Sequence, residues 1–205
     1  GGGGRFDAGM LYYCPQIWCS DNTDAIERLR IQYGTSFGYP MSSVSAHVSV
    51  CPNHQNHRVT PFKTRGICAM QGTFGYELDL SKMTDEEKKM AGEQIAFFKE
   101  HGRLFQFGDY YRLTSPFENR DYTVWEYAAQ DGSEACMSVV YTDMYANAAS
   151  EIVKWKGLDP KKVYQMQLDG EDAGNFSGAA LMHAGILLPL PEQNYDAFQI
   201  YLKAE

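Results

Sequence analysis

The spacing of apolar residues changes near Gly108, and this change limits the folds that the chain can adopt. Before it, a run with helical spacing at 23–33 is followed by a run of period two at 44–50. Helices and strands that alternate over short connections predict parallel strands and therefore an α/β unit. After it, short apolar runs are separated by turn signals such as DGS, GLDP and DGEDAGN. The sequence therefore predicts an α/β part, residues 1–107, and an antiparallel β-sandwich or curled sheet, residues 108–205.

Local signals place a first helix after residue 23. Ile26 and Leu29 share one helical face, and Ser20 or Asp21 is expected to supply the N-cap. Asp24 lies in the first turn, where a carboxylate favours the helix dipole, and it is expected to pair with Arg28 four residues later.

Two further runs of the first part alternate with period two and are predicted to be strands: SVSAHVSV at 43–50 and TFGYELDL at 73–80. The segment between them, at 60–71, is predicted to form a short helix. Thr84 and Glu87 form a capping box that opens another helix. In the second part the strand candidates are TVWEYAAQ, ACMSVVYT, KVYQMQLD, ALMHAGILL and AFQIYL.

The composition excludes several classes of function. A net charge of −8 and a pI near 5.1 argue against nucleic acid, whose binders carry a concentrated basic face. No apolar run approaches the ~20 residues of a membrane helix, so no membrane is expected as a partner. Five cysteines without a CxxC pair indicate buried thiols in a reducing compartment, the cytoplasm. His54 and His57 are close in sequence, but their loop offers no third ligand, so no metal site is expected.

A glycine-rich start, GGGGR at 1–5, is followed by the pattern QxWxSDxxDxxxR at 16–28. In this order, and together with AHVSVCPNHQNHR, GTFGYELDL and the β-rich tail, these motifs resemble the α-galactosidases of glycoside hydrolase family 36. The resemblance implies the last strands and helices of a (β/α)8 barrel, followed by a C-terminal antiparallel β-sandwich domain. The expected fold class is thus α/β followed by all-β.

The resemblance also implies roles for individual residues. A retaining glycosidase needs a nucleophile and a second carboxyl group that acts as acid and base, and the resemblance assigns the acid/base role to Asp21. Gly1 and Gly2 match positions whose backbone lies against bound galactose. Trp18 either lines the sugar pocket or belongs to the barrel core. On spacing alone, Asp21 is instead a helix N-cap. No cofactor is expected.

The family pattern further implies that the chain starts near the end of the fifth barrel strand. The upstream lysine–tryptophan–aspartate segment that carries the nucleophile is absent from the 205 residues, so the chain alone is expected to be inactive. The parent protein is expected to hydrolyse terminal α-galactose from oligosaccharides such as melibiose or raffinose, and to form a tetramer. Two alternatives remain: a non-catalytic carbohydrate-binding or interaction module, and a relative that transfers galactose or acts on α-N-acetylgalactosaminides.

Overall fold

The computed structural model describes residues 8–205, which divide into two compact units between Gln106 and Phe107. No helix in this part of the chain is long and apolar enough to cross a membrane. The elements of the first unit are η1 (Ala8–Tyr12), α1 (Ala25–Thr35), η2 (Met41–Ser43), β1 (Val48–Ser49), α2 (Phe62–Ala69), β2 (Tyr76–Glu77), η3 (Leu80–Lys82), α3 (Asp85–Glu100) and α4 (Gly102–Phe107).

Three neighbouring segments of the first unit run parallel. β1 pairs with β2 through Val48 and Tyr76. Single parallel bridges join Ile17 to Val44 and Ser45 to Thr73, so the strand near residue 17 lies beside the strand that ends in β1. The prediction of parallel strands is confirmed, although the regular ladders are shorter than the period-two runs.

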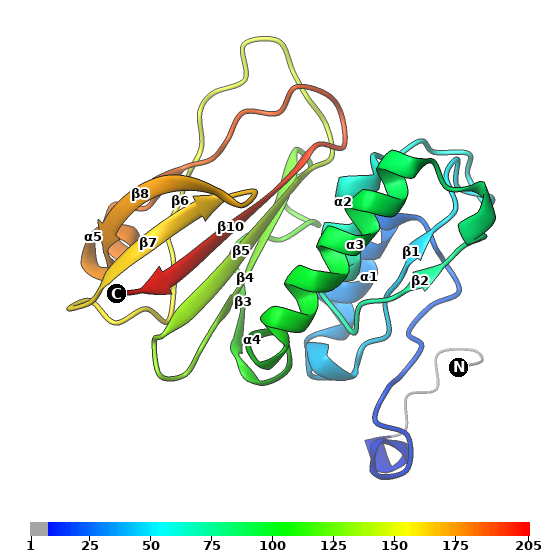
Figure 1. The fold of residues 1–205 in the computed structure, drawn as a ribbon, viewed down its shortest axis with the longest axis horizontal. Coiled ribbons are helices and arrows are strands. Elements are labelled where there is room, and N and C mark those ends of the chain that lie inside the picture. The colour runs from blue at the N-terminus through cyan, green and yellow to red at the C-terminus, as the bar shows by residue number, and fades with distance from the viewer. Residues whose placement is uncertain (1–7) are drawn as a thin grey trace. The chain divides into compact units, whose positions relative to one another are not determined.

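Helices cover one side of these strands, and Figure 1 shows α1, α2 and α3 beside β1 and β2. Ala46 and Val48 are buried in a cluster with Phe62 of α2. Because successive strand side chains point to opposite faces, His47 is directed away from this cluster. The alternation in SVSAHVSV therefore separates a side that faces the helices from a polar side that faces away from them.

The predicted start of α1 is wrong. Asp24, and not Ser20 or Asp21, is the N-cap, and its side chain accepts a hydrogen bond from the Glu27 backbone N–H at 3.0 Å. The expected ion pair between Asp24 and Arg28 does not form, because the capping carboxylate is directed to its own helix end, where it pairs with Arg58. The predicted capping box of α3, by contrast, is present.

The second unit is built on one antiparallel sheet of six strands in the order β3-β4-β5-β10-β7-β8, with β6 and β9 forming a separate two-stranded ribbon. Figure 1 shows the long strands β4, β5 and β10 side by side. The bounds are β3 (Asp109–Arg112), β4 (Tyr122–Ala128), β5 (Glu134–Tyr141), β6 (Ile152–Val153), β7 (Val163–Leu168), β8 (Glu171–Ser177), α5 (Gly178–His183), β9 (Ile186–Leu187) and β10 (Ala197–Ala204).

The core of this unit lies between one face of the sheet and a covering layer made of the β6–β9 ribbon, α5 and the segment after β6. Trp155, Leu181 and Leu188 of this layer are 1–2% exposed and pack against strand residues such as Met137 and Leu202.

Two predictions for the tail are wrong. The run at 180–188 is not a strand but α5 followed by β9, because Ser177 caps a helix that Gly185 ends with a φ of +82°. The run DGEDAGN is a turn only at Asp169 and Gly170, where φ is positive, and β8 begins at the next residue. β8 is an edge strand whose side chains are mostly exposed, so it lacks the hydrophobic alternation that marks a half-buried strand.

Glu126 of β4 lies inside this core and has no exposed surface. Its neighbours on the same face of β4 are Val124 and Ala128, and its carboxyl group accepts a hydrogen bond from the Lys156 backbone N–H at 3.0 Å. Removal from water raises the pKa of Glu126 to about 8, against the opposing effect of Lys156.

This raised pKa makes the stability of the tail dependent on pH. Between about pH 4.5 and pH 8 the folded chain keeps a proton that the unfolded chain releases, so the free energy of unfolding falls as pH rises. Glu126→Gln is expected to remove this decrease, which amounts to at most about 4 kcal/mol. Urea unfolding at pH 5 and pH 8, followed by the fluorescence of Trp125 and Trp155, measures it. Glu171→Gln, at an exposed position, is the control, and parallel pH dependences of Glu126→Gln and the wild-type chain would contradict the prediction.

Candidate active site

Asp21 lies just beyond the C-terminal end of the strand marked by Ile17. Its Oδ1 atom accepts a hydrogen bond of 2.9 Å from the Trp18 indole Nε1. Asp21 is exposed and Trp18 is half-buried. The two residues singled out in the pattern at 16–28 are therefore in direct contact, and Trp18 fixes the direction of the carboxyl group.

Trp18 is in turn held by aromatic and cationic neighbours. Its ring stacks on His47, with centroids 4.7 Å apart and planes 9° from parallel. The guanidinium group of Arg28 lies 5.0 Å from its ring centroid, at cation–π distance. Arg28 is buried and also donates to the backbone oxygens of Ser20 and Ser45, at 3.0 and 2.6 Å. Arg28 therefore bonds to the backbone beside Trp18 and does not pair with Asp24, the N-cap of α1.

His47 extends this group to the third parallel strand. Its Nε2 atom is 2.5 Å from Glu77 Oε2, and Ser49 Oγ is 2.9 Å from its Nδ1 atom. Burial lowers the pKa of His47, an effect that Glu77 opposes and Arg28 reinforces. Trp18, His47 and Glu77 thus form a row across three adjacent parallel segments. Trp18 and Glu77 lie at the C-terminal ends of theirs, the end at which barrel enzymes place their active sites.

His47 and Glu77 were not predicted as site residues. The sequence did contain a signal for His47: it alternates with Ala46 and Val48, so its side chain lies on the face of the strand that points away from the helices. Gly1 and Gly2 lie outside the described residues. His54 and His57 are exposed loop residues, and residues 8–205 contain no group of three His, Cys, Asp or Glu side chains that could hold a metal ion.

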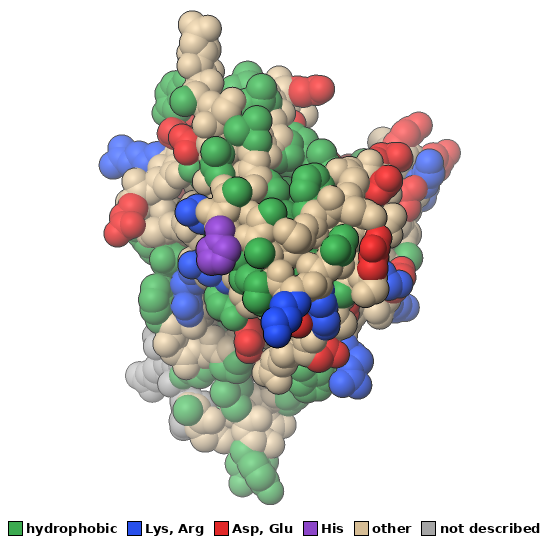
Figure 2. Space-filling model, turned by 90° about the vertical axis from the view of Figure 1, so that its left-hand side faces the viewer, with side chains coloured by type: hydrophobic (Ala, Val, Ile, Leu, Met, Phe, Trp, Pro, Cys, Tyr) green, Lys and Arg blue, Asp and Glu red, His purple; other side chains and the backbone are tan. Residues whose placement is uncertain are grey.

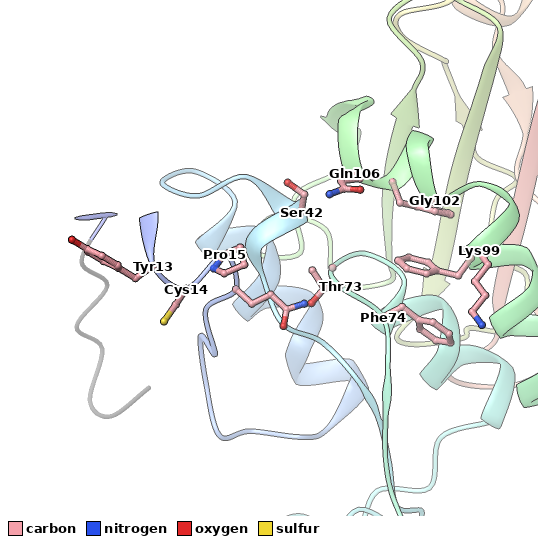
Figure 3. A pocket seen from close by; sticks show the side chains of 13 residues that line it. Tyr13, Cys14, Pro15, Ser42, Thr73, Phe74, Lys99, Gly102 and Gln106 are labelled. Carbon is pink, nitrogen blue, oxygen red and sulfur yellow. The ribbon is translucent and has the colours of Figure 1, made fainter. Parts of the chain in front are cut away.

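A cavity of about 790 Å³ in the first unit lies at the opposite ends of the strands (Figure 3). Pro15, Ser42 and Thr73, which line it, precede or begin the three parallel segments. The remaining lining residues are Tyr13, Cys14, Gln16, Gly72, Phe74, Phe98, Lys99, Gly102, Phe105 and Gln106. Asp21 is not among them, so this cavity is not the site at which Asp21 would act.

Charge is distributed rather than concentrated on the surface that Figure 2 presents. Acidic and basic side chains are interspersed there with apolar ones.

Comparison with known proteins decides the family. A sequence model described as Melibiase matches residues 1–108, more than half of the 205 residues. The chain belongs to the melibiase family. A second match, to the glycosyl hydrolase family 36 C-terminal domain, covers residues 122–202 of this melibiase-family chain. The resemblance to family 36 α-galactosidases is thereby confirmed.

Curated relatives and solved structures agree with this assignment. The melibiase-family chain is 53% identical over 199 residues to the bifunctional α-galactosidase/sucrose kinase AgaSK of Mediterraneibacter gnavus, covering 97% of this chain and 21% of that protein. It is 50% identical to the α-galactosidase AgaA of Geobacillus stearothermophilus, covering 100% of this chain and 27% of that protein. The crystal structure of AgaA, a family 36 α-galactosidase, superposes with a TM-score of 0.94 at 49% identity, covering 100% of this chain and 28% of that chain.

These matches confirm the predicted fold class, the end of a (β/α)8 barrel followed by a β-domain. The chain spans about a quarter of the length of the relatives it matches. AgaA variants have also been solved in complex with raffinose and with stachyose.

Proposed function

We propose that this chain carries the acid/base half of the active site of a retaining α-galactosidase. The observation that supports it is the Asp21 carboxyl group, held by Trp18 Nε1 at 2.9 Å beyond the C-terminal end of a parallel strand. Barrel enzymes bind and convert their substrates at this end. The contact also explains the spacing of tryptophan and aspartate in the pattern at 16–28, because residues three apart, Trp18 and Asp21, form this hydrogen bond.

In the proposed reaction a carboxylate from a segment outside the 205 residues attacks the anomeric carbon of galactose. Asp21 donates its proton to the departing glycosidic oxygen as the C–O bond breaks, which leaves a covalent galactosyl-enzyme and an ionised Asp21. Asp21 then takes a proton from water, whose oxygen attacks the anomeric carbon as the bond between that carbon and the nucleophilic carboxylate breaks. This step releases galactose with its α-configuration retained and returns both carboxyl groups to their starting states.

The proposed substrates are oligosaccharides with a terminal α-linked galactose, of the melibiose and raffinose type. The complexes of AgaA variants with raffinose and stachyose support this class. Trp18, half-buried beside Asp21, is proposed to line the sugar pocket. Gly1 and Gly2 are proposed to bring their backbone against the galactose.

A chimera tests the proposal. This chain replaces the matching segment of AgaA, to which it aligns over its full length at 50% identity, and hydrolysis of melibiose is measured. We expect the AgaA chimera to be active and to release galactose in its α-form first, as seen by NMR. A folded chimera without activity would contradict the proposal and favour a non-catalytic role for the chain.

We further propose that the parent protein works in the cytoplasm as a homotetramer. All five cysteines are free thiols, which fits a reducing compartment. The prediction that they are buried is correct only for Cys68 and Cys136, since Cys14 is exposed and the other two are partly exposed. The tetramer rests on the family resemblance, and light scattering on the purified AgaA chimera tests it.

A further inference from the structure

Residues 51–60, in the loop between β1 and α2, carry the motif CPNHQNHR, to which the proposed reaction gives no role. This loop lies against the segment that holds Asp21. Four side chains of the loop and the segment, Asn53, Gln55, Arg58 and Asp24, join the two. The loop is therefore placed to determine where the Asp21 backbone lies.

Gln55 makes the most direct of these contacts. Its Nε2 atom donates to the Asp21 backbone oxygen at 3.0 Å, and its Oε1 atom accepts from the Thr23 backbone N–H at 3.1 Å. One amide group thus bonds two backbone groups that are two residues apart. Asp21 and Thr23 lie between a strand end and the start of α1, where no helix or sheet ladder positions them. The side chain of Gln55, from another loop, positions these two backbone groups instead.

The loop itself is fixed, so it can act as a support. Asn53 is only 4% exposed, and its Oδ1 atom accepts from the Gln55 backbone N–H at 2.9 Å. Its Nδ2 atom donates to Thr23 Oγ1 at 3.0 Å. Arg58, at the end of the loop, pairs with the buried Asp24. Gln55 is consequently anchored at its own backbone before it reaches Asp21.

We propose that Gln55 is a positioning residue for the Asp21 carboxyl group. The structure gives Asp21 two independent constraints: Trp18 holds its carboxyl oxygen, and Gln55 holds its backbone oxygen. The two act on different groups, because the Trp18 bond fixes one carboxyl oxygen and does not fix the Asp21 backbone. This inference rests on the proposed acid/base role of Asp21.

The consequence for catalysis is specific. A displaced acid slows proton transfer to the leaving oxygen, and a misplacement of about 1 Å can cost 10²-fold in rate. Substrates with a very acidic leaving group need no protonation and are expected to be spared. A role of Gln55 in overall stability would instead reduce the rates for all substrates alike.

The first test uses the 205-residue chain and does not depend on the proposed function. Gln55→Ala and Gln55→Met both remove the hydrogen bonds of this amide group to Asp21 and Thr23, and Gln55→Met keeps most of the side-chain length. We expect both to raise the hydrogen-exchange rate of the Thr23 amide at least tenfold. The Arg28 amide, bonded inside α1 to the Asp24 backbone oxygen at 2.9 Å, is expected to stay unchanged. An unchanged Thr23 rate overturns the inference.

The second test uses the AgaA chimera. For both Gln55 variants we expect kcat/KM to fall 10- to 100-fold on melibiose and less than threefold on 2,4-dinitrophenyl α-galactoside. The control is His54→Ala, at an exposed position in the same loop, which is expected to leave both values within twofold. Equal losses on the two substrates, or recovery in Gln55→Met, overturn the inference. Asp21→Asn, measured alongside, shows separately whether the acid/base role itself fails.

Discussion

Asp21→Asn in the AgaA chimera is expected to lower kcat/KM for melibiose about 10³-fold, within the range of general acid catalysis. Asparagine has nearly the same shape as aspartate, and its Oδ1 atom can still accept the hydrogen bond that Trp18 Nε1 makes to Asp21 at 2.9 Å. The side chain should therefore stay in place and lose only its ability to give and take a proton. For 2,4-dinitrophenyl α-galactoside, which needs no protonation, kcat/KM is expected to fall less than about tenfold.

Hydrolysis of the galactosyl-enzyme, the second half of the proposed reaction, can be measured separately on Asp21→Asn with azide. Asp21 is proposed to activate water in the hydrolysis of the galactosyl-enzyme, a step that azide can replace because it attacks without losing a proton. Azide is expected to raise the turnover of the dinitrophenyl substrate by Asp21→Asn and to yield α-galactosyl azide. It is expected to leave the unsubstituted chimera unaffected.

The control for Asp21→Asn is Asp24→Asn, three residues further along the chain. Asp24 is buried, caps α1 and pairs with Arg58, so its substitution is expected to lower stability. Because asparagine still offers an oxygen to Arg58 and to the Glu27 backbone N–H, the loop at 51–60 should stay in place. The ratio of kcat/KM values between melibiose and the dinitrophenyl substrate should therefore stay that of the unsubstituted chimera. If Asp21→Asn lost the same factor on both substrates, its loss would not come from acid catalysis.

The start of α1 shows why sequence located this site only in part. Ser20, Asp21, Asn22, Thr23 and Asp24 are all good N-cap residues, so local propensity cannot choose among them. Tertiary and local contacts make the choice. Trp18 takes the Asp21 carboxyl group, Ser20 Oγ accepts from the Asn22 backbone N–H, and Asn22 Oδ1 accepts from the Asp24 backbone N–H. Thr23 Oγ1 accepts from Asn53 Nδ2. Asp24 is then the residue left to cap the helix.

The periodicity of a sequence cannot predict polar contacts between residues that are far apart in the chain. The alternation in SVSAHVSV predicted a strand, and from it the side on which His47 lies follows directly. The contacts of Gln55 with Asp21 and Thr23 span 34 and 32 residues and leave no local pattern. The tail shows the same limit, because the exposed edge strand β8 lacks the hydrophobic alternation by which a strand is recognised.

Gly185→Ala is expected to destabilise the tail by an amount on the order of 3 kcal/mol. Gly185 has a φ of +82°, which costs an alanine about 1–2 kcal/mol. A Cβ atom there would also lie 2.6 Å from the Val153 backbone oxygen, closer than such atoms can approach. Val153 belongs to β6, which pairs with β9 immediately after Gly185. Both the end of α5 and the start of the ribbon would have to move.

Gly170→Ala separates these two contributions. Gly170 has a φ of +86°, but nothing lies within 4 Å of the position of its Cβ atom, so this variant is expected to lose only the conformational part. Urea unfolding of the 205-residue chain, followed by the fluorescence of Trp125 and Trp155, gives the free energy of unfolding of each variant. Gly185→Ala should be less stable than Gly170→Ala by at least about 1 kcal/mol. Equal losses would mean that β6 shifts away from the added methyl group at little cost, and that the ribbon does not hold α5 in place.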